Sequence, residues 1–137
     1  MTNYWILKSE PSVYSFDDLL RDGRTVWDGV RNAQALANIR RMALSDRILI
    51  YHSNEGKALV GLAEVARAPY PDPRADDARL AVIDVAARAR LPREVALSVI
   101  KADPALAGLG LVRQSRLSVV PVTAPEWARL SDLAGLP

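Results

Sequence analysis

The stretch that decides the fold is Asp46–Ala66, DRILIYHSNEGKALVGLAEVA. Its first part, Asp46–His52, contains the continuous apolar run of a mostly buried strand, and Ala58–Ala66 has a similar composition. Between them, Asn54–Lys57 supplies the asparagine and glycine that are typical of a tight turn. The two runs therefore predict a β-hairpin.

The segments on either side of this hairpin predict further strands and helices. Strands are expected at residues 3–9, 25–27, 80–90 and 117–122, and helices at residues 34–42 and 92–100 and after two capping boxes, Ser15 with Asp18 and Thr123 with Glu126. Pro69, Pro71 and Pro73 predict an exposed loop. Because the strands between residues 46 and 90 are expected to pair locally, the order favours an α+β fold with a curved, partly closed sheet. Since no linker-like segment interrupts the pattern, we expect one domain over residues 1–137.

Composition excludes several kinds of site. The 137 residues are 50% hydrophobic and 25% charged, as in an ordinary globular domain. With no cysteine and a single histidine, the chain lacks the ligands of a zinc site, and no metal or cofactor is expected. Arginine supplies 15 of the 18 basic residues, but the net charge of only +2 gives no argument for non-specific nucleic-acid binding. Without a signal-peptide pattern or a membrane-spanning run, the sequence predicts a cytoplasmic protein with no membrane partner.

Three polar-aromatic clusters carry the candidate chemistry. Their sequences are YWILKSEP at Tyr4–Pro11, VWDGVRN at Val26–Asn32 and YHSN at Tyr51–Asn54. The clusters and the segments between them contain six of the eight aromatic residues. A pocket with aromatic walls and a few aimed polar groups suits a flat, polar ligand such as a nucleobase. A structural role is open for each cluster too, because Trp27 suits a protein core and Ser9 can satisfy loop backbone groups.

Local geometry limits which residues of these clusters can line one pocket. Asn32 can cap the helix that follows it, and the free N–H groups at that helix start would face the neighbourhood of Trp27, flanked by Arg31. Strand alternation sends Tyr51 and Ser53 to one face and His52 to the other, so only part of this triplet can line one cavity. The segment RQSRLS at residues 113–118 suits a solvated loop better than a phosphate-contacting edge.

A hydrolytic triad is a weaker interpretation. His52 with Ser9 or Ser53 and with Glu10 or Asp28 would supply the residue types. However, the nucleophile-elbow pattern is missing, and a histidine at the end of a buried strand is more often a hydrogen-bonded structural residue. A protein without enzymatic activity is favoured.

The motifs resemble the EVE domain, a member of the PUA-like superfamily. The resemblance covers essentially the whole chain in order, through residues 5–11 (WILKSEP), 26–32 (VWDGVRN), 46–54 (DRILIYHSN), 60–65 (VGLAEV), 70–73 (YPDP), 83–85 (IDV) and 112–122 (VRQSRLSVVPV), followed by Glu126-Trp127. It implies an α+β fold in which a PUA-like curved β-barrel carries peripheral helices.

The resemblance also implies a function. Relatives in the superfamily include readers of modified bases in RNA and DNA, so we expect a non-enzymatic, monomeric reader of methylated or hydroxymethylated cytosine, with DNA favoured over RNA. Carried over by motif, the ligand-binding candidates are Ser9, Trp27, Val30, Arg31, Asn32, Tyr51 and Ser53. Weaker candidates for the nucleic-acid backbone are Lys8, Arg113 and Arg116. The alternatives are an RNA-binding module of the PUA type, a small-molecule or nucleotide-binding protein, and a hydrolase.

The sequence departs from the family pattern at four places. Ala33 stands where an aromatic residue usually follows the VRN triplet, and Ser45 stands where a glycine usually precedes the aspartate. The loop after Pro73 is short, and the strand Leu80-Ala81-Val82 lacks an aromatic pair. These departures put the identity of the ligand in question more than the fold.

Overall fold

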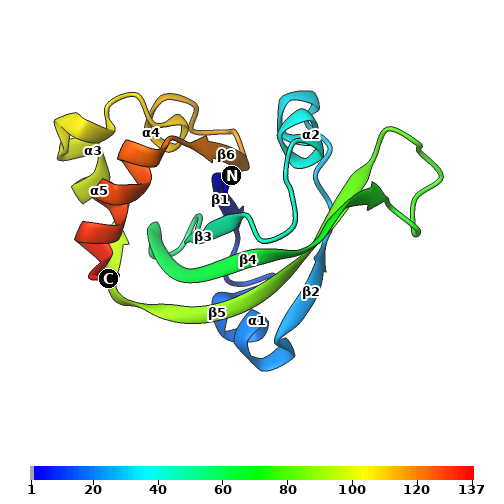
Figure 1. Ribbon diagram of the computed structural model, residues 1–137, viewed down its shortest axis with the longest axis horizontal. Coiled ribbons are helices and arrows are strands. Elements are labelled where there is room, and N and C mark those ends of the chain that lie inside the picture. Colours follow the sequence, from blue (N-terminus) through cyan, green and yellow to red (C-terminus); the bar gives the residue numbers. More distant parts are fainter. Residues whose placement is uncertain (1) are drawn as a thin grey trace.

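Six strands form one mixed sheet in the order β2-β5-β4-β3-β1-β6, and the sheet curves strongly along its length (Figure 1). The computed structural model describes residues 2–137. The strands are β1 (Tyr4–Ser9), β2 (Arg24–Trp27), β3 (Arg47–His52), β4 (Ala58–Pro71), β5 (Ala81–Ala96) and β6 (Val119–Val122). The helices are α1 (Phe16–Asp22), α2 (Ala33–Arg40), α3 (Leu97–Ala102), α4 (Gly110–Arg113) and α5 (Ala124–Ala134), with a 3₁₀ turn at Pro104–Leu106.

The predicted hairpin and the α+β class are confirmed. β3 pairs antiparallel with β4, from Arg47 opposite Glu64 to His52 opposite Ala58. β1 lies between β3, to which it is parallel, and β6, to which it is antiparallel. The sheet is open, because β2 and β6 are its two edges. Figure 1 shows α3, α4 and α5 gathered at one end of the curved sheet, α2 towards the other end, and α1 beside β2.

The helix predicted at residues 92–100 is wrong in its first half. β5 continues to Ala96, and only Leu97–Ala102 is helical. Pro92 is tolerated in the strand because the register against β4 shifts between Leu59 and Gly61, opposite this part of β5. Proline is found at such irregularities because no ladder hydrogen bond is lost there.

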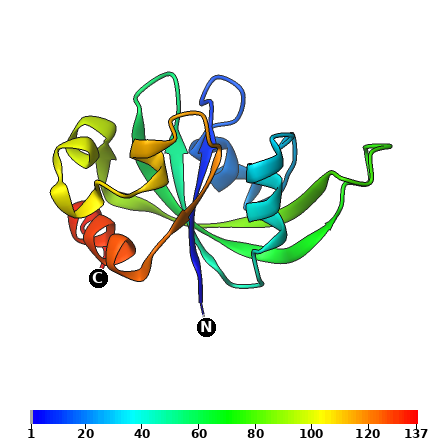
Figure 2. The same cartoon turned by 90° about the horizontal axis from the view of Figure 1, so that it is seen from above.

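The exposed loop predicted around the three prolines begins later than expected. β4 includes Pro69 and ends at Pro71. Pro69 lies in another register shift, between Arg67 and Tyr70, where its missing N–H costs no ladder bond. The distal part of the β4–β5 hairpin projects from the rest of the molecule (Figure 2).

Both capping boxes are confirmed. Ser15 caps α1 through the backbone of Asp18, and Thr123 caps α5 through the backbone of Glu126, with the reciprocal bonds present. α1 packs against β2 and β5, and α5 packs against β5. Each helix therefore begins where its local sequence predicts and is then held by the sheet.

A buried carboxylate fixes the entry to β3. Asp46 is 1% exposed and accepts hydrogen bonds from Trp5 Nε1 at 3.0 Å, Asn3 N at 3.1 Å and Ala43 N at 3.0 Å. The preceding Ser45 has a φ of 72°, in the left-handed region that glycine adopts at lower cost. The departure from the family glycine at this position therefore leaves local backbone strain. Within residues 2–137, the helices are too short or too polar to cross a membrane.

Candidate functional site

A hollow of about 830 Å³ opens between the end of β1 and the edge strand β2, and we call it the Trp27 cleft. Its lining residues come from β1 and the loop after it, from β2, and from the distal part of the β4–β5 hairpin. They are Lys8, Ser9, Glu10, Val13, Tyr14, Arg24, Thr25, Val26, Trp27, Asp28, Arg74 and Asp84.

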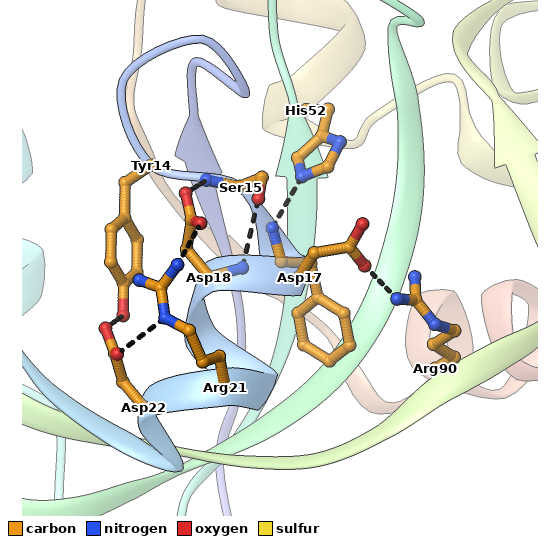
Figure 3. Close-up of polar contacts among 9 residues, drawn as sticks. Tyr14, Ser15, Asp17, Asp18, Arg21, Asp22, His52 and Arg90 are labelled. Carbon is orange, nitrogen blue, oxygen red and sulfur yellow. Dashed lines mark hydrogen bonds and ion pairs between the residues drawn. The ribbon is translucent and has the colours of Figure 1, made fainter.

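Two aromatic rings form one wall of this cleft. Tyr14 and Trp27 meet edge to face, with their ring centroids 6.4 Å apart and their planes at 83°. Trp27 is only partly buried, so it packs against the core and also lines the cleft. Ser9 Oγ donates to the carbonyl of Tyr14. The hydroxyl of Tyr14 donates to Asp22 at 2.8 Å (Figure 3). Burial raises the pKa of Tyr14, so its hydroxyl stays protonated at neutral pH.

The cleft continues around the edge of the sheet. Val26 pairs with Asp84 and Trp27 pairs with Ile83, so Val26 and Asp84 face one side of this two-strand ribbon while Trp27 faces the other. Since β2 is an edge strand, residues from both faces line one hollow. Asp84 is 8% exposed. Burial alone would raise the pKa of Asp84, but hydrogen bonds from Tyr70 and Arg24 outweigh it and lower the pKa.

A second, smaller hollow of about 330 Å³ lies beside the first residues of α2, and we call it the Arg113 groove. Its lining residues are Asn32, Gln34, Arg113, Gln114, Ser115, Arg116 and Leu117. Asn32 caps α2 by accepting a hydrogen bond from Ala35 N at 3.0 Å, as predicted. Arg113 and Arg116 make no ion pair within residues 2–137, so their guanidinium groups are available to an anion.

Lys8 connects the two hollows. It lines the Trp27 cleft, and its Nζ donates to the carbonyl of Ser115 in the Arg113 groove at 2.7 Å. The ammonium group also lies 5.9 Å from the centre of the Tyr51 ring. Burial lowers the pKa of Lys8. Part of its donor capacity is therefore used to hold Ser115 against β1.

The structure divides the predicted site residues among different places. Ser9 and Trp27 line the Trp27 cleft together with Lys8, whereas Asn32, Arg113 and Arg116 line the Arg113 groove. The remaining candidates line neither hollow: Val30 and Tyr51 are buried, Arg31 is exposed and Ser53 is partly exposed. The binding roles of all these residues stay predictions.

Sequence reasoning missed most of the other lining residues, among them Tyr14, Arg24 and Asp84. None of these three was among the predicted binding residues. For Asp84 a signal exists, because a carboxylate inside the apolar run of β5 requires polar partners when it is buried. Arg24 has no such signal, because it lies 60 residues before Asp84 and nothing in the local sequence indicates their contact. Within residues 2–137, no group of three or more His, Cys, Asp or Glu is placed to hold a metal ion.

The single histidine has a structural partner. Phe16 N, at the first position of α1, donates to His52 Nε2 at 2.9 Å (Figure 3). Only a neutral imidazole can accept this bond, and burial lowers the pKa of His52, with Glu94 opposing the effect. His52 therefore holds the start of α1, next to the Tyr14 wall of the cleft.

This contact predicts a pH dependence of stability. Because the pKa of His52 in the folded protein lies below its ordinary value of about 6.5, neutral His52 stabilises the fold above that pH, and the contribution is lost as the pH falls. We expect urea unfolding to show a loss of no more than about 1 kcal/mol between pH 7.5 and 5.5, since the group is partly exposed. In His52→Gln, whose amide oxygen can accept the same bond without titrating, this loss should shrink. An equal loss in both proteins would contradict the assignment.

Comparisons with known proteins agree with the fold and its sequence motifs. Residues 3–133 match the EVE domain family. Thymocyte nuclear protein 1 of Rattus norvegicus is 31% identical over 161 residues, which cover 93% of this chain and 71% of that protein. A solved protein from Agrobacterium tumefaciens is 40% identical with a TM-score of 0.96, covering 98% of this chain and 94% of that one.

A further solved relative contains nucleic acid. The human THYN1 protein, solved in complex with 5-methylcytosine-containing DNA, is 27% identical, with a TM-score of 0.89 and 99% of both chains covered. The predicted PUA-like architecture is confirmed by this likeness together with the curved mixed sheet. The chain belongs to the EVE domain family.

Proposed function

We propose that this protein is a non-enzymatic reader that binds a modified base of nucleic acid in the Trp27 cleft, with methylated or hydroxymethylated cytosine in DNA as the favoured ligand. The observation that carries the proposal is the Tyr14–Trp27 wall in a hollow of about 830 Å³, which offers room and aromatic surface for a base. The human relative solved with 5-methylcytosine-containing DNA supports the choice of ligand and of DNA over RNA.

The energetics suit a weak, selective reader. Flipping a base out of a stack costs a few kcal/mol, less in a single strand, and stacking on an aromatic side chain returns roughly 1–3 kcal/mol. Burying one methyl group adds only about 0.8 kcal/mol. Discrimination between modified and plain cytosine therefore requires steric fit and hydrogen bonds to the base edge, which the polar lining residues of the cleft can supply.

The Arg113 groove supplies a place for the backbone of the same strand. Arg113 and Arg116 line it together with the first residues of α2, where backbone N–H groups and the helix dipole favour an anion. Lys8 joins the groove to the Trp27 cleft through Ser115. A phosphate in the groove and a base in the cleft thus fit one continuous ligand.

Replacing Trp27 with alanine tests the proposal. Trp27→Ala should lower the affinity for a single-stranded oligonucleotide that contains 5-methylcytosine by roughly 10–100-fold, because base stacking is lost. Trp27→Phe should keep most of the affinity, since an aromatic ring remains. Fluorescence anisotropy measures binding, and urea unfolding checks that each variant is folded. A folded Trp27→Ala protein with the affinity of the wild type would refute the role of the cleft.

His52 favours the reader over the hydrolase alternative. As the only histidine in the chain, it already accepts a hydrogen bond from the backbone of Phe16. Turnover of a nucleotide-like substrate that disappears in His52→Ala would support the hydrolase alternative. Binding without product formation would exclude it. Competition between matched RNA and DNA strands separates the RNA-binding alternative. The monomeric state and the cytoplasmic location stay predictions, and the curated relatives are named nuclear proteins.

A further inference from the structure

A second group of arginines lies on the β2 side of the Trp27 cleft. Arg24 comes from the edge strand β2, Arg67 from the distal part of β4, and Arg74 from the loop after it. The Arg24 side chain is 55% exposed, and Arg67 and Arg74 are exposed residues. Arg24 and Arg74 line the cleft itself, so this surface is continuous with the proposed base site.

Two of these guanidinium groups are held by the hydrogen-bonded pair of Asp84 and Tyr70. Arg24 donates to Oδ2 of Asp84 from Nε at 3.2 Å and from Nη2 at 2.8 Å. The hydroxyl of Tyr70 donates to the other carboxylate oxygen, and the guanidinium of Arg67 lies 3.7 Å from the centre of the Tyr70 ring. A guanidinium that is already oriented loses less conformational freedom when it binds an anion.

The charges around this pair leave guanidinium groups for a ligand. Asp84 interacts electrostatically with Arg24 and Arg67, and it forms an ion pair with only Arg24. In the neighbouring loop, Asp77 forms an ion pair with Arg79, and Asp72 accepts a hydrogen bond from the backbone N–H of Arg74. Within residues 2–137, neither Arg67 nor Arg74 makes an ion pair.

A flipped base explains why a reader would have two basic surfaces. The strand that carries the base continues on both its 5′ and 3′ sides, so its two flanks leave the cleft in different directions. The Arg113 groove adjoins the cleft on the β1 side, through the contact of Lys8 with Ser115. The arginines described here adjoin it on the β2 side.

We propose that Arg24, Arg67 and Arg74 form a second phosphate-binding surface, which receives the flank of the strand that the Arg113 groove does not hold. This inference rests on the proposed function, because it assumes a base in the Trp27 cleft. The occupant is the sugar-phosphate backbone, whose oxygens a guanidinium can bind in bidentate fashion.

The double variant Arg67→Gln/Arg74→Gln tests this surface, and it leaves the Arg24–Asp84 ion pair intact. Its matched control is Arg47→Gln/Lys101→Gln, which removes the same charge from exposed residues that line neither hollow. The probe is a single-stranded DNA with one central 5-methylcytosine, together with two shortened forms that lack either the 5′ or the 3′ flank. Thermal unfolding confirms that the variants are folded.

We expect the test variant, but not the control, to bind the full probe several-fold more weakly. The slope of log affinity against log salt concentration should become shallower by about 1.4, because two phosphate contacts are lost and each contact to a single strand contributes about 0.7. Removing the flank that these arginines hold should weaken binding to the wild type more than binding to the test variant, which keeps only Arg24, and this difference identifies the flank. A test variant that matches the control in slope and in response to both shortened probes overturns the proposal.

Failure of the proposed function gives a different result. If the wild type binds 5-methylcytosine and plain cytosine probes equally, and Trp27→Ala does not change this, then the base site is refuted. The salt slopes and the shortened probes still report on the arginines in that case. The two ideas therefore fail in separate measurements.

Discussion

Replacing Gly61 with alanine is expected to destabilise the protein by about 2–3 kcal/mol. Gly61 lies in β4 directly beneath the ring of Phe16, and a methyl group added there would overlap the ring carbons. Phe16 is 1% exposed and is the first residue of α1, so its ring has no open space into which to move. Overpacking of this kind forces side chains off their preferred rotamers or shifts the backbone.

Urea unfolding of Gly61→Ala measures this effect. Gly108→Ala is the matched control, because its added methyl would meet only Glu126 Oε2, at 3.9 Å. The double variant Phe16→Leu/Gly61→Ala should recover part of the loss, since a smaller side chain makes room and contacting residues couple. A wild-type unfolding midpoint for Gly61→Ala would show that α1 can move away from β4. The Tyr14 wall of the cleft, which precedes α1, would then be movable too.

Replacing Asp46 with alanine should cost about 3 kcal/mol of unfolding free energy. The change leaves three hydrogen-bond donors without their acceptor, on Trp5, Asn3 and Ala43. A buried donor without a partner costs about 1–3 kcal/mol, and the two backbone donors, being only partly buried, can recover some of this from water.

The control for this prediction is Asp132→Ala, an exposed carboxylate on α5 that should change stability by less than about 0.5 kcal/mol. Asp46→Asn keeps one acceptor oxygen and should fall between the two. In a double-mutant cycle with Trp5→Phe, the losses should be less than additive because both changes break the same bond. Full additivity would show that the Trp5–Asp46 bond contributes nothing to stability.

Local features of this fold were predictable from the sequence. The hairpin of β3 and β4 follows from two apolar runs around a turn, and both capping boxes depend on residues three positions apart. The same holds for Asn32, which caps α2 as expected. In each case, the residues that decide the structure are near neighbours in the chain.

Features that depend on distant pairing were not predictable. Proline at residue 92 indicated the first turn of a helix, but a register shift between β4 and β5 makes a strand acceptable there. Tyr51 was predicted as a pocket residue by its motif alone, and only the parallel pairing of β1 with β3 shows that it lies beside Lys8 and is 4% exposed. Arg24 and Asp84 are 60 positions apart, and only the pairing of β2 with β5 brings them together.

The position of β1 between β3 and β6 has a consequence for synthesis on the ribosome. Tyr4 pairs with Val122, and its ring stacks on Trp127 with their centroids 4.6 Å apart. The first strand thus gains one of its two neighbours only after residues 119–122 have been translated. Until then, the hydrogen-bonding edge of β1 that β6 will cover stays open, and unpaired strand edges promote aggregation. Slow translation of the residues between β1 and β6 would therefore lengthen the time during which a nascent chain is open to chaperones or to other nascent chains.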